Sequence, residues 1–254
     1  MTTTIGTAVR HRPRLDPDSR GGLRLTLAAV GALILAVPFA ALLLLVVDHW
    51  GPLRRLDHDL TSRLNAFAFP HLGYVTFLKV ITTVGHPAVF DAVSVAVALW
   101  LFRRRQRRLA AWLVVTVFGG GLLSTVVKDV VDRRRPLLPH PVAHAASASF
   151  PSGHAIGSVV GVGVLLLVFL PGARRRARPA WVAIGALVVL AIGFSRLGLG
   201  LHYLSDVLGG YVLGAGWLAV STAAFTAWRR ELGQPERPAL AGLEPAAPEP
   251  PPEG

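Results

Sequence analysis

The sequence predicts an all-α polytopic membrane protein of six transmembrane helices, with an interfacial helix between the first two. Three observations support this fold class. The chain of 254 residues is 52% hydrophobic and only 16% charged, whereas an ordinary soluble domain has about 25% charged residues. The charge deficit is concentrated in apolar blocks long enough to cross a bilayer. Arginine clusters separate these blocks, as in loops that fix the topology of a membrane protein.

The first predicted span is the apolar run from Leu25 to Val47. At about 1.5 Å per residue, it crosses a hydrocarbon core of about 30 Å. A cleaved signal peptide has a shorter apolar region followed by small residues, whereas Asp48-His49-Trp50 follows this run, so a retained helix is favoured. Pro38 is expected to bend it. The mixed segment 56–84 is predicted to be amphipathic and interfacial. The five other predicted spans are 88–102, 109–127, 152–170, 180–194 and 203–228.

Three parts of the chain are predicted from composition: a flexible tail over 1–22, a six-helix membrane domain over 23–230, and a disordered tail rich in Pro, Ala and Glu over 231–254. Of the 26 basic residues, most fall in the two tails and in the second and fourth loops. The positive-inside rule therefore predicts that both termini are cytoplasmic in a multi-pass protein of the cell membrane.

The net charge of +12 is also compatible with a nucleic-acid-binding protein. Membrane-length apolar runs separate the arginines, however, so we interpret them as topology signals and predict no nucleic-acid partner. The chain has no cysteine, which excludes disulfides, thiolate catalysis and cysteine metal sites. The sequence does not predict an oligomeric state.

Three short motifs carry the chemistry. In the first, Lys128 is followed after six residues by Arg135-Pro136. The second is Pro151-Ser152-Gly153-His154. The third is Ser195-Arg196, then His202 after five residues and Asp206 after three more. In the predicted topology all three fall on the outer face of the membrane, so we expect them to form one site.

These residue types suit phosphoryl transfer, which needs charge neutralisation on the phosphate oxygens and an in-line nucleophile. Lys128, Arg135 and Arg196 supply cations, and a guanidinium can bond two oxygens at once. Ser152 can cap a helix whose free first-turn amides bind an anion. Gly153 has no side chain, which allows a phosphate to approach the backbone.

The remaining motif residues suit acid and nucleophilic catalysis. His154 lies in the first turn beside the predicted phosphate and can protonate a leaving alcohol. His202 is the candidate nucleophile. Asp206 lies four residues later, on the same helix face if the sixth span begins here. A carboxylate on one imidazole nitrogen leaves the other nitrogen free to attack phosphorus.

Each motif also has a structural interpretation. The basic cluster ending at Arg135 could face anionic lipid headgroups, Ser152-Gly153-His154 could be an ordinary helix start, and His202 with Asp206 could be an ordinary i,i+4 pair. Their occurrence in order, on one predicted face, favours the catalytic interpretation.

In these motifs the chain closely resembles the type 2 phosphatidic acid phosphatase superfamily, over roughly residues 55–225. Every specified position of the family signature is matched. The resemblance implies six helices with the site on the outer face, and a metal-independent phosphatase without a cofactor. It implies that His154 is the acid, that His202 forms a phosphohistidine and that Asp206 supports it. The implied phosphate ligands are Lys128, Arg135, Ser152, Gly153 and Arg196.

The resulting prediction is an integral membrane enzyme that hydrolyses a lipid phosphate monoester or diphosphate. Candidate substrates are of the undecaprenyl diphosphate, phosphatidate or phosphatidylglycerophosphate type. A non-catalytic lipid-phosphate binder or transporter on the same scaffold is the alternative, although such a protein is expected to lose the catalytic residues. A vanadate-dependent oxidase is a second alternative, which the apolar spans weigh against.

The sequence leaves the roles of several residues undecided. Asp91 and Lys79 lie in or near apolar segments, where ionisable residues are often functional, but both can also reach the interface. His140 and His144 have a spacing that suits a metal on a helix, whereas Pro139 and Pro141 indicate a loop. Glycines four residues apart predict close helix packing of the fourth span against a neighbour; they are Gly153, Gly157, Gly161, Gly210 and Gly214.

Overall fold

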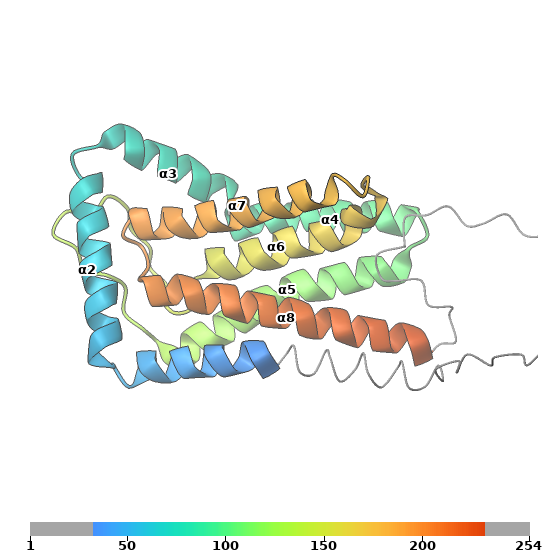
Figure 1. Ribbon diagram of the computed structural model, residues 1–254, viewed down its shortest axis with the longest axis horizontal. Coiled ribbons are helices and arrows are strands. Elements are labelled where there is room, and N and C mark those ends of the chain that lie inside the picture. Colours follow the sequence, from blue (N-terminus) through green and yellow to red (C-terminus); the bar gives the residue numbers. More distant parts are fainter. Residues whose placement is uncertain (1–32, 232–254) are drawn as a thin grey trace, which may run out of the picture.

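The computed structural model of the protein describes residues 33–231, and all regular secondary structure in this range is helical (Figure 1). The predicted tail 1–22, residues 25–32 of the first predicted span, and residues 232–254 of the predicted tail 231–254 lie outside the described residues. The described part of the first helix is Leu33–Val47. The others are α2 (Gly51–Ala68), α3 (Leu72–Val84), α4 (Pro87–Arg103), α5 (Arg107–Val131), α6 (Gly153–Phe169), the 3₁₀ turn η1 (Leu170–Gly172), α7 (Arg178–Gly198) and α8 (Leu204–Glu231).

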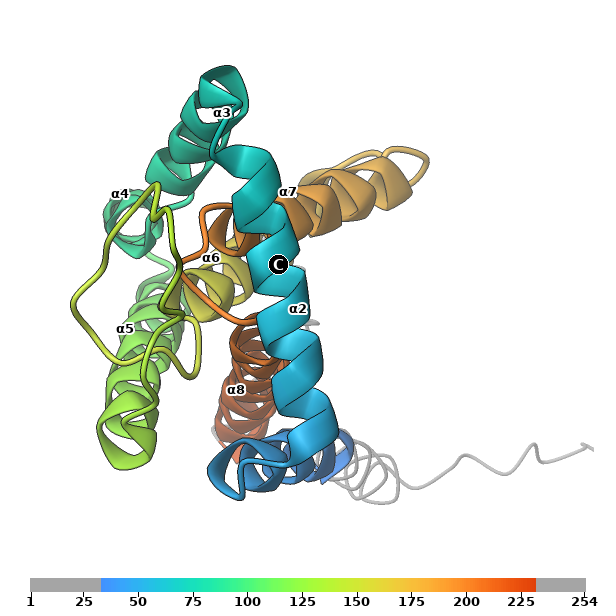
Figure 2. The ribbon, with the colours of Figure 1, turned by 90° about the vertical axis from the view of Figure 1, so that its left-hand side faces the viewer.

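Most helices run along the long axis of a bundle, and α2 crosses one end of it (Figures 1 and 2). Helix α6 is central, because it packs against α4, α5, α7 and α8. The main apolar core lies between α5, α6 and α8 and includes the fully buried Leu113, Val160 and Val164. We call the end that α2 crosses the α2 end of the bundle.

The structure agrees with the six predicted spans if the first helix and α2 are counted together as one bent span. Among the described residues, five helical segments are long and apolar enough to cross a membrane. The pair Leu33–Val47 and Gly51–Ala68 passes the same test together but is bent by 86°. The bend follows from local sequence: His49 has a φ of 52°, and Pro52 lies in the first turn of α2, a position that suits proline. The protein is therefore a multi-pass membrane protein.

The predicted interfacial segment 56–84 is only partly correct. Its first part is α2, but its second part is α3, which together with α4 forms a candidate span over Leu72–Arg103. Gly85-His86-Pro87 interrupts this span, as the sequence indicated. The periodicity of the segment was misleading, because the polar residues that α2 buries (Asp57, Thr61 and Asn65) face the protein rather than water.

Small residues bring α6 close to its neighbours, which confirms the predicted glycine packing. A methyl group on Gly210 of α8 would lie 2.8 Å from the Ser152 carbonyl oxygen, and one on Gly214 would lie 3.2 Å from that of Ile156. On the opposite side, Gly161 of α6 accommodates the ring of Phe90 from α4. The α6 and α8 backbones therefore meet in direct contact, which fixes the start of α6 relative to the start of α8.

Candidate functional site

All three motifs reach the α2 end of the bundle, although they come from five parts of the chain. Lys128 is in the last turn of α5, and Arg135 is in the loop that follows. Ser152 precedes α6, and Arg196 is in the last turn of α7. His202 and Asp206 lie just before and inside α8. The Ser152 N–H donates to the Asp206 carbonyl (2.9 Å). This hydrogen bond holds the end of the loop after α5 against the start of α8.

Two of the predicted phosphate-binding cations are linked by a serine that sequence reasoning missed. Arg135 donates from Nε to the Ser147 carbonyl (2.6 Å) and from Nη2 to the Ser147 hydroxyl (3.1 Å). Lys128 Nζ lies 3.4 Å from the same hydroxyl. Ser147 therefore holds an ammonium and a guanidinium side by side, which costs electrostatic energy unless an anion binds between them. Its position in an irregular loop left no periodic signal.

The start of α6 has free anion-binding groups, but Ser152 does not cap it as predicted. Ser152 occupies the N-cap position without a side-chain hydrogen bond to the helix. Its hydroxyl is buried and has no hydrogen-bond partner among the described residues. A buried unsatisfied hydroxyl is costly, and a bound ligand would satisfy it. Gly153 leaves room beneath Lys128, since a methyl group there would lie 3.7 Å from Nζ.

His154 lies beside the same cluster. It is close enough to interact electrostatically with Lys128, Arg196 and His202. Its ring contacts that of His86 edge to face, with centroids 5.1 Å apart. His86 caps α4 by accepting from Ala88 N–H with Nδ1 (3.2 Å). The two imidazoles of the predicted acid and nucleophile thus share one site, with cations around them.

Arg196 is nearly buried, with an exposed fraction of 6%. It donates from Nη1 to the Thr82 hydroxyl of α3 (2.7 Å), while its buried Nε–H has no partner among the described residues. Thr82 orients the guanidinium from a helix that sequence reasoning had placed at the interface. An unused buried N–H beside Arg135 and Lys128 adds a further donor for an anion.

His202 is held between Asp206 and Arg135. Its Nδ1 lies 3.4 Å from Oδ2 of Asp206, within ion-pair range but longer than a typical hydrogen bond. Nη1 of Arg135 lies 3.2 Å from Nε2 and also donates to the Leu201 carbonyl (2.6 Å). Because a guanidinium only donates, Nε2 accepts, which places the ring proton on Nδ1, facing the carboxylate.

The reason for the His202–Asp206 pairing differs from the predicted one. Helix α8 begins at Leu204, so His202 lies in the preceding turn rather than on a shared helix face. Burial first, and the charges of Arg135 and Arg196 to a lesser extent, lower the pKa of His202 from 6.5 to about 4 overall, against the opposing effect of Asp206. The imidazole is therefore neutral at physiological pH, as a nucleophile requires.

Asp206 is fully buried and accepts several hydrogen bonds. Oδ2 accepts from the Ser149 hydroxyl and from Tyr203 N–H (2.8 Å), and Oδ1 accepts from Nη1 of Arg133 (2.6 Å). Sequence reasoning had grouped Arg133 with a basic cluster and had not considered Ser149. These bonds fix the carboxylate in the orientation that faces His202.

Arg133 connects this carboxylate to α2. Its Nη2 donates to Oδ2 of the fully buried Asp57 (2.9 Å). Asp57 also accepts from the backbone N–H (3.0 Å) and the hydroxyl (2.5 Å) of Ser205. Burial lowers the pKa of Arg133, but Asp206 and Asp57 outweigh burial and raise it overall. The hydrogen-bonded chain therefore runs from α2 through Arg133 to Asp206, whose carboxylate faces His202.

The other residues singled out from the sequence lie elsewhere. Asp91 lines an apolar groove of about 200 Å³ between α4, α5 and α6, which extends to Gly153. His140 stacks on Phe69, with ring centroids 4.2 Å apart, and its carbonyl accepts from Asn65 (2.8 Å), so it fastens the loop to α2. His144 is exposed. Within residues 33–231, no three His, Asp or Glu side chains are arranged to hold a metal ion.

Comparisons with known proteins identify relatives of this chain. Residues 109–230 match the family model of the PAP2 superfamily. The chain is 33% identical over 148 residues to phosphatidylglycerophosphatase B of Bacillus subtilis, covering 57% of this chain and 66% of that protein, which is just under two thirds. It is 34% identical over 144 residues to decaprenylphosphoryl-5-phosphoribose phosphatase of Mycolicibacterium smegmatis, covering 54% of this chain and 72% of that protein.

A solved structure shares the fold over most of the chain. It is the crystal structure of a transmembrane PAP2 type phosphatidylglycerolphosphate phosphatase from Bacillus subtilis, with a TM-score of 0.67 and 25% sequence identity. The match covers 82% of this chain and 99% of that one. With the three motifs gathered at one end of a helical membrane bundle, these similarities lead to one conclusion: the chain belongs to the PAP2 superfamily.

Proposed function

We propose that the protein is an integral membrane phosphatase that hydrolyses the phosphate monoester or diphosphate of a lipid through a phosphohistidine. The observation that carries this proposal is the placement of His202: Nδ1 faces a fixed carboxylate, while Nε2 faces the guanidinium of Arg135. A phosphate drawn to the cations places its phosphorus next to a neutral, oriented imidazole nitrogen.

The reaction proceeds in two displacements. Nε2 of His202 attacks phosphorus, the bond from phosphorus to the leaving oxygen breaks, and His154 donates a proton to that oxygen. Lys128, Arg135 and Arg196 neutralise the charge on the equatorial oxygens, together with the first amides of α6. His154 then removes a proton from water, which attacks the phosphohistidine. The N–P bond breaks, and inorganic phosphate leaves.

A lipid is the favoured substrate because of what adjoins the site. The groove between α4, α5 and α6 is lined mostly by apolar and small residues and reaches Gly153. An acyl or isoprenoid chain in that groove brings its headgroup to Lys128, whereas a soluble sugar phosphate gains nothing from the groove. The two relatives above are named for different lipid phosphates, so undecaprenyl diphosphate, phosphatidate and phosphatidylglycerophosphate types all remain in the proposal.

The test is phosphate release by the purified protein in detergent, with these three lipids as substrates and a chelator present. We expect turnover that survives chelation. His202→Ala should lower kcat by roughly a thousandfold or more, because the nucleophile is removed. The matched control is His144→Ala, which removes an exposed imidazole from the same end and should leave kcat unchanged. Lipid phosphate binding without turnover in the wild-type protein would instead identify a binder or transporter.

A further inference from the structure

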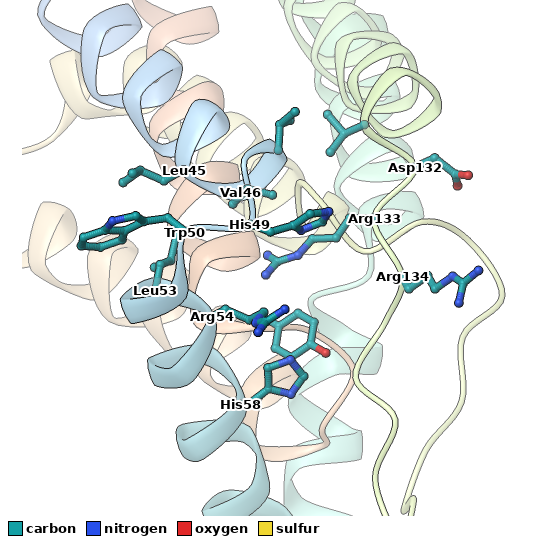
Figure 3. A pocket seen from close by; sticks show the side chains of 13 residues that line it. Leu45, Val46, His49, Trp50, Leu53, Arg54, His58, Asp132, Arg133 and Arg134 are labelled. Atoms are coloured by element: carbon teal, nitrogen blue, oxygen red, sulfur yellow. The ribbon is translucent and has the colours of Figure 1, made fainter.

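A second cavity lies at the α2 end, apart from the proposed catalytic site. It has a volume of about 500 Å³, in the range of small-molecule sites. It occupies the elbow between the first helix and α2, where Arg133 lines it (Figure 3). Tyr203 is also a lining residue. Neither His154 nor His202 lines it. We call it the elbow cavity, and the phosphatase mechanism does not use it.

The lining of the elbow cavity is mostly basic on its polar side. His49, Arg54 and His58 gather around the guanidinium of Arg133 (Figure 3). Among the described residues of the lining, Asp132 is the only acidic one, and both its carboxylate and the side chain of Arg134 point away from this group (Figure 3). A guanidinium at a surface attracts an anion, and imidazole N–H groups beside it can donate hydrogen bonds to the same anion.

The basic side chains differ in whether other residues of the protein already interact with them. Arg133 is committed to Asp57 and Asp206, and the ring of His58 contacts that of Tyr203, with centroids 5.0 Å apart. Arg54 is exposed, and it makes no ion pair or side-chain hydrogen bond with any residue in 33–231. The guanidinium of Arg54 is therefore available for a ligand.

The remaining side of the cavity is apolar and belongs to the membrane-facing surface. Leu45, Val46, Val47 and Leu53 line it. Val47 and the neighbouring Leu44 are exposed by 56% and 68%. Exposed apolar side chains on a helix that crosses a bilayer contact lipid chains. The elbow cavity thus combines a cationic side with an apolar side that is continuous with the lipid-facing surface.

We propose that the elbow cavity binds the anionic phosphodiester headgroup of a membrane phospholipid, with Arg54 as its main charged contact and the acyl chains against Leu45 and Leu53. A free phosphate has the same anionic group but cannot use the apolar side, so the lipid is the better ligand. This site does not depend on the proposed hydrolysis, because a phosphodiester lacks the terminal phosphate that His202 would attack.

The test uses the full-length protein in detergent micelles and short-chain phosphatidylglycerol as the probe. Trp50 lines the elbow cavity, so binding is followed through tryptophan emission, with Trp50→Phe identifying the signal that comes from this residue. We expect a saturable change with phosphatidylglycerol and none with phosphatidylcholine of the same chain length. Arg54→Gln should raise the Kd roughly tenfold, as expected when one charge-assisted contact is lost.

The matched control is Arg55→Gln, which removes the same charge from the same turn of α2 at a residue outside the lining. It should leave the Kd unchanged. The proposal is overturned by no saturable change, by equal binding of phosphatidylcholine, by an unaltered Kd in Arg54→Gln, or by an equal loss in Arg55→Gln. Inorganic phosphate is the last arm: displacement of the lipid by phosphate at similar concentration would show a free-anion site instead. None of these readouts requires turnover.

Discussion

His202 shows how single contacts prepare a side chain for reaction. Its two ring nitrogens have different partners: Nδ1 lies 3.4 Å from the Asp206 carboxylate, and Nε2 lies 3.2 Å from Arg135. The carboxylate selects the tautomer, while burial keeps the ring neutral. In the proposed reaction, an arriving phosphate would take Arg135 as its partner and free Nε2 for attack, so that binding would also activate the nucleophile.

The first prediction concerns the protonation of this residue. Because burial holds the pKa of His202 near 4, below its ordinary value of 6.5, the ring should stay neutral throughout the pH range in which exposed histidines become protonated. Titration of ¹⁵N-histidine-labelled protein by NMR should show one imidazole that protonates near pH 4 and is missing from the His202→Ala spectrum. A midpoint near 6.5 for that signal would contradict the burial described above.

The same shift has a consequence for stability. The unfolded chain binds a proton at His202 between pH 6.5 and about 4, whereas the folded chain does not. The stability that comes from keeping this ring neutral is therefore present above pH 6.5 and is lost progressively as the pH falls toward 4.

The sequence predicted the residues of the three motifs and their gathering at one end, but not the residues that orient them. Asp57 and Arg133 are 76 positions apart in the chain, and neither had a local pattern that paired it with the other. Ser147 binds partly through its carbonyl, which no side-chain motif reveals. The Ser152 hydroxyl was expected to cap α6 and does not, because cap preference describes averages and not one residue at a ligand site.

At the scale of elements, α2 has an unusual distribution of polarity. Its buried face carries Asp57, Thr61 and Asn65, while Leu56 and Phe67 are exposed. A helix with polar residues inside and apolar residues outside suits a position against lipid, with its polar face closing the site. Helix α2 therefore fixes the position of Arg133 and of the loop after α5.

The second prediction tests this role of α2. Asp57→Asn keeps the shape of the side chain but removes the charge that pairs with Arg133, so Asp206 should lose its fixed orientation. We expect kcat to fall by about tenfold to a hundredfold, as small displacements of catalytic groups do, with little change in KM. Both constants are measured with the best lipid substrate of the panel.

Asp59→Asn is the control for this variant, because Asp59 is an exposed carboxylate on the same helix. It should change neither constant. A normal kcat in Asp57→Asn would show that α2 does not contribute to catalysis. A rise in KM alone would assign Asp57 to substrate binding instead.

Helix positions were predictable where composition was decisive. The runs that became α5, α6, α7 and α8 are apolar over membrane length, and their ends were displaced by only a few residues. The segment before Gly85 was harder, because its mixed composition fits both an interfacial helix and the first half of an interrupted span. The contacts of α3 with α7 decide between these alternatives, and such contacts are not visible in the local sequence.

At the scale of the whole molecule, the arginine clusters and the site lie at opposite ends of the bundle. The clusters after α4 and after α6 are far from the α2 end, which carries the motifs (Figure 1). By the positive-inside rule we propose that the clusters face the cytoplasm, so the site opens on the outer face of the cell membrane.

The third prediction tests this orientation, and the absence of cysteine from the chain makes the test simple. Leu137→Cys places a thiol in the loop at the α2 end, at a position that is 91% exposed. Arg175→Cys places one in the exposed turn between α6 and α7. In intact cells, a membrane-impermeant maleimide should label the first variant and leave the second unlabelled until the cells are lysed. The reverse pattern would place the site in the cytoplasm.

The backbone contact between α6 and α8 determines how the molecule responds to its lipid surroundings. Helices that meet through glycines, with a hydrogen bond from Ser152 to Asp206 at one end, cannot slide along each other without breaking that fit. A thinner or thicker bilayer is then accommodated by tilting the pair as a rigid unit. We therefore expect the spacing between the two histidines to change little with the thickness of the surrounding bilayer.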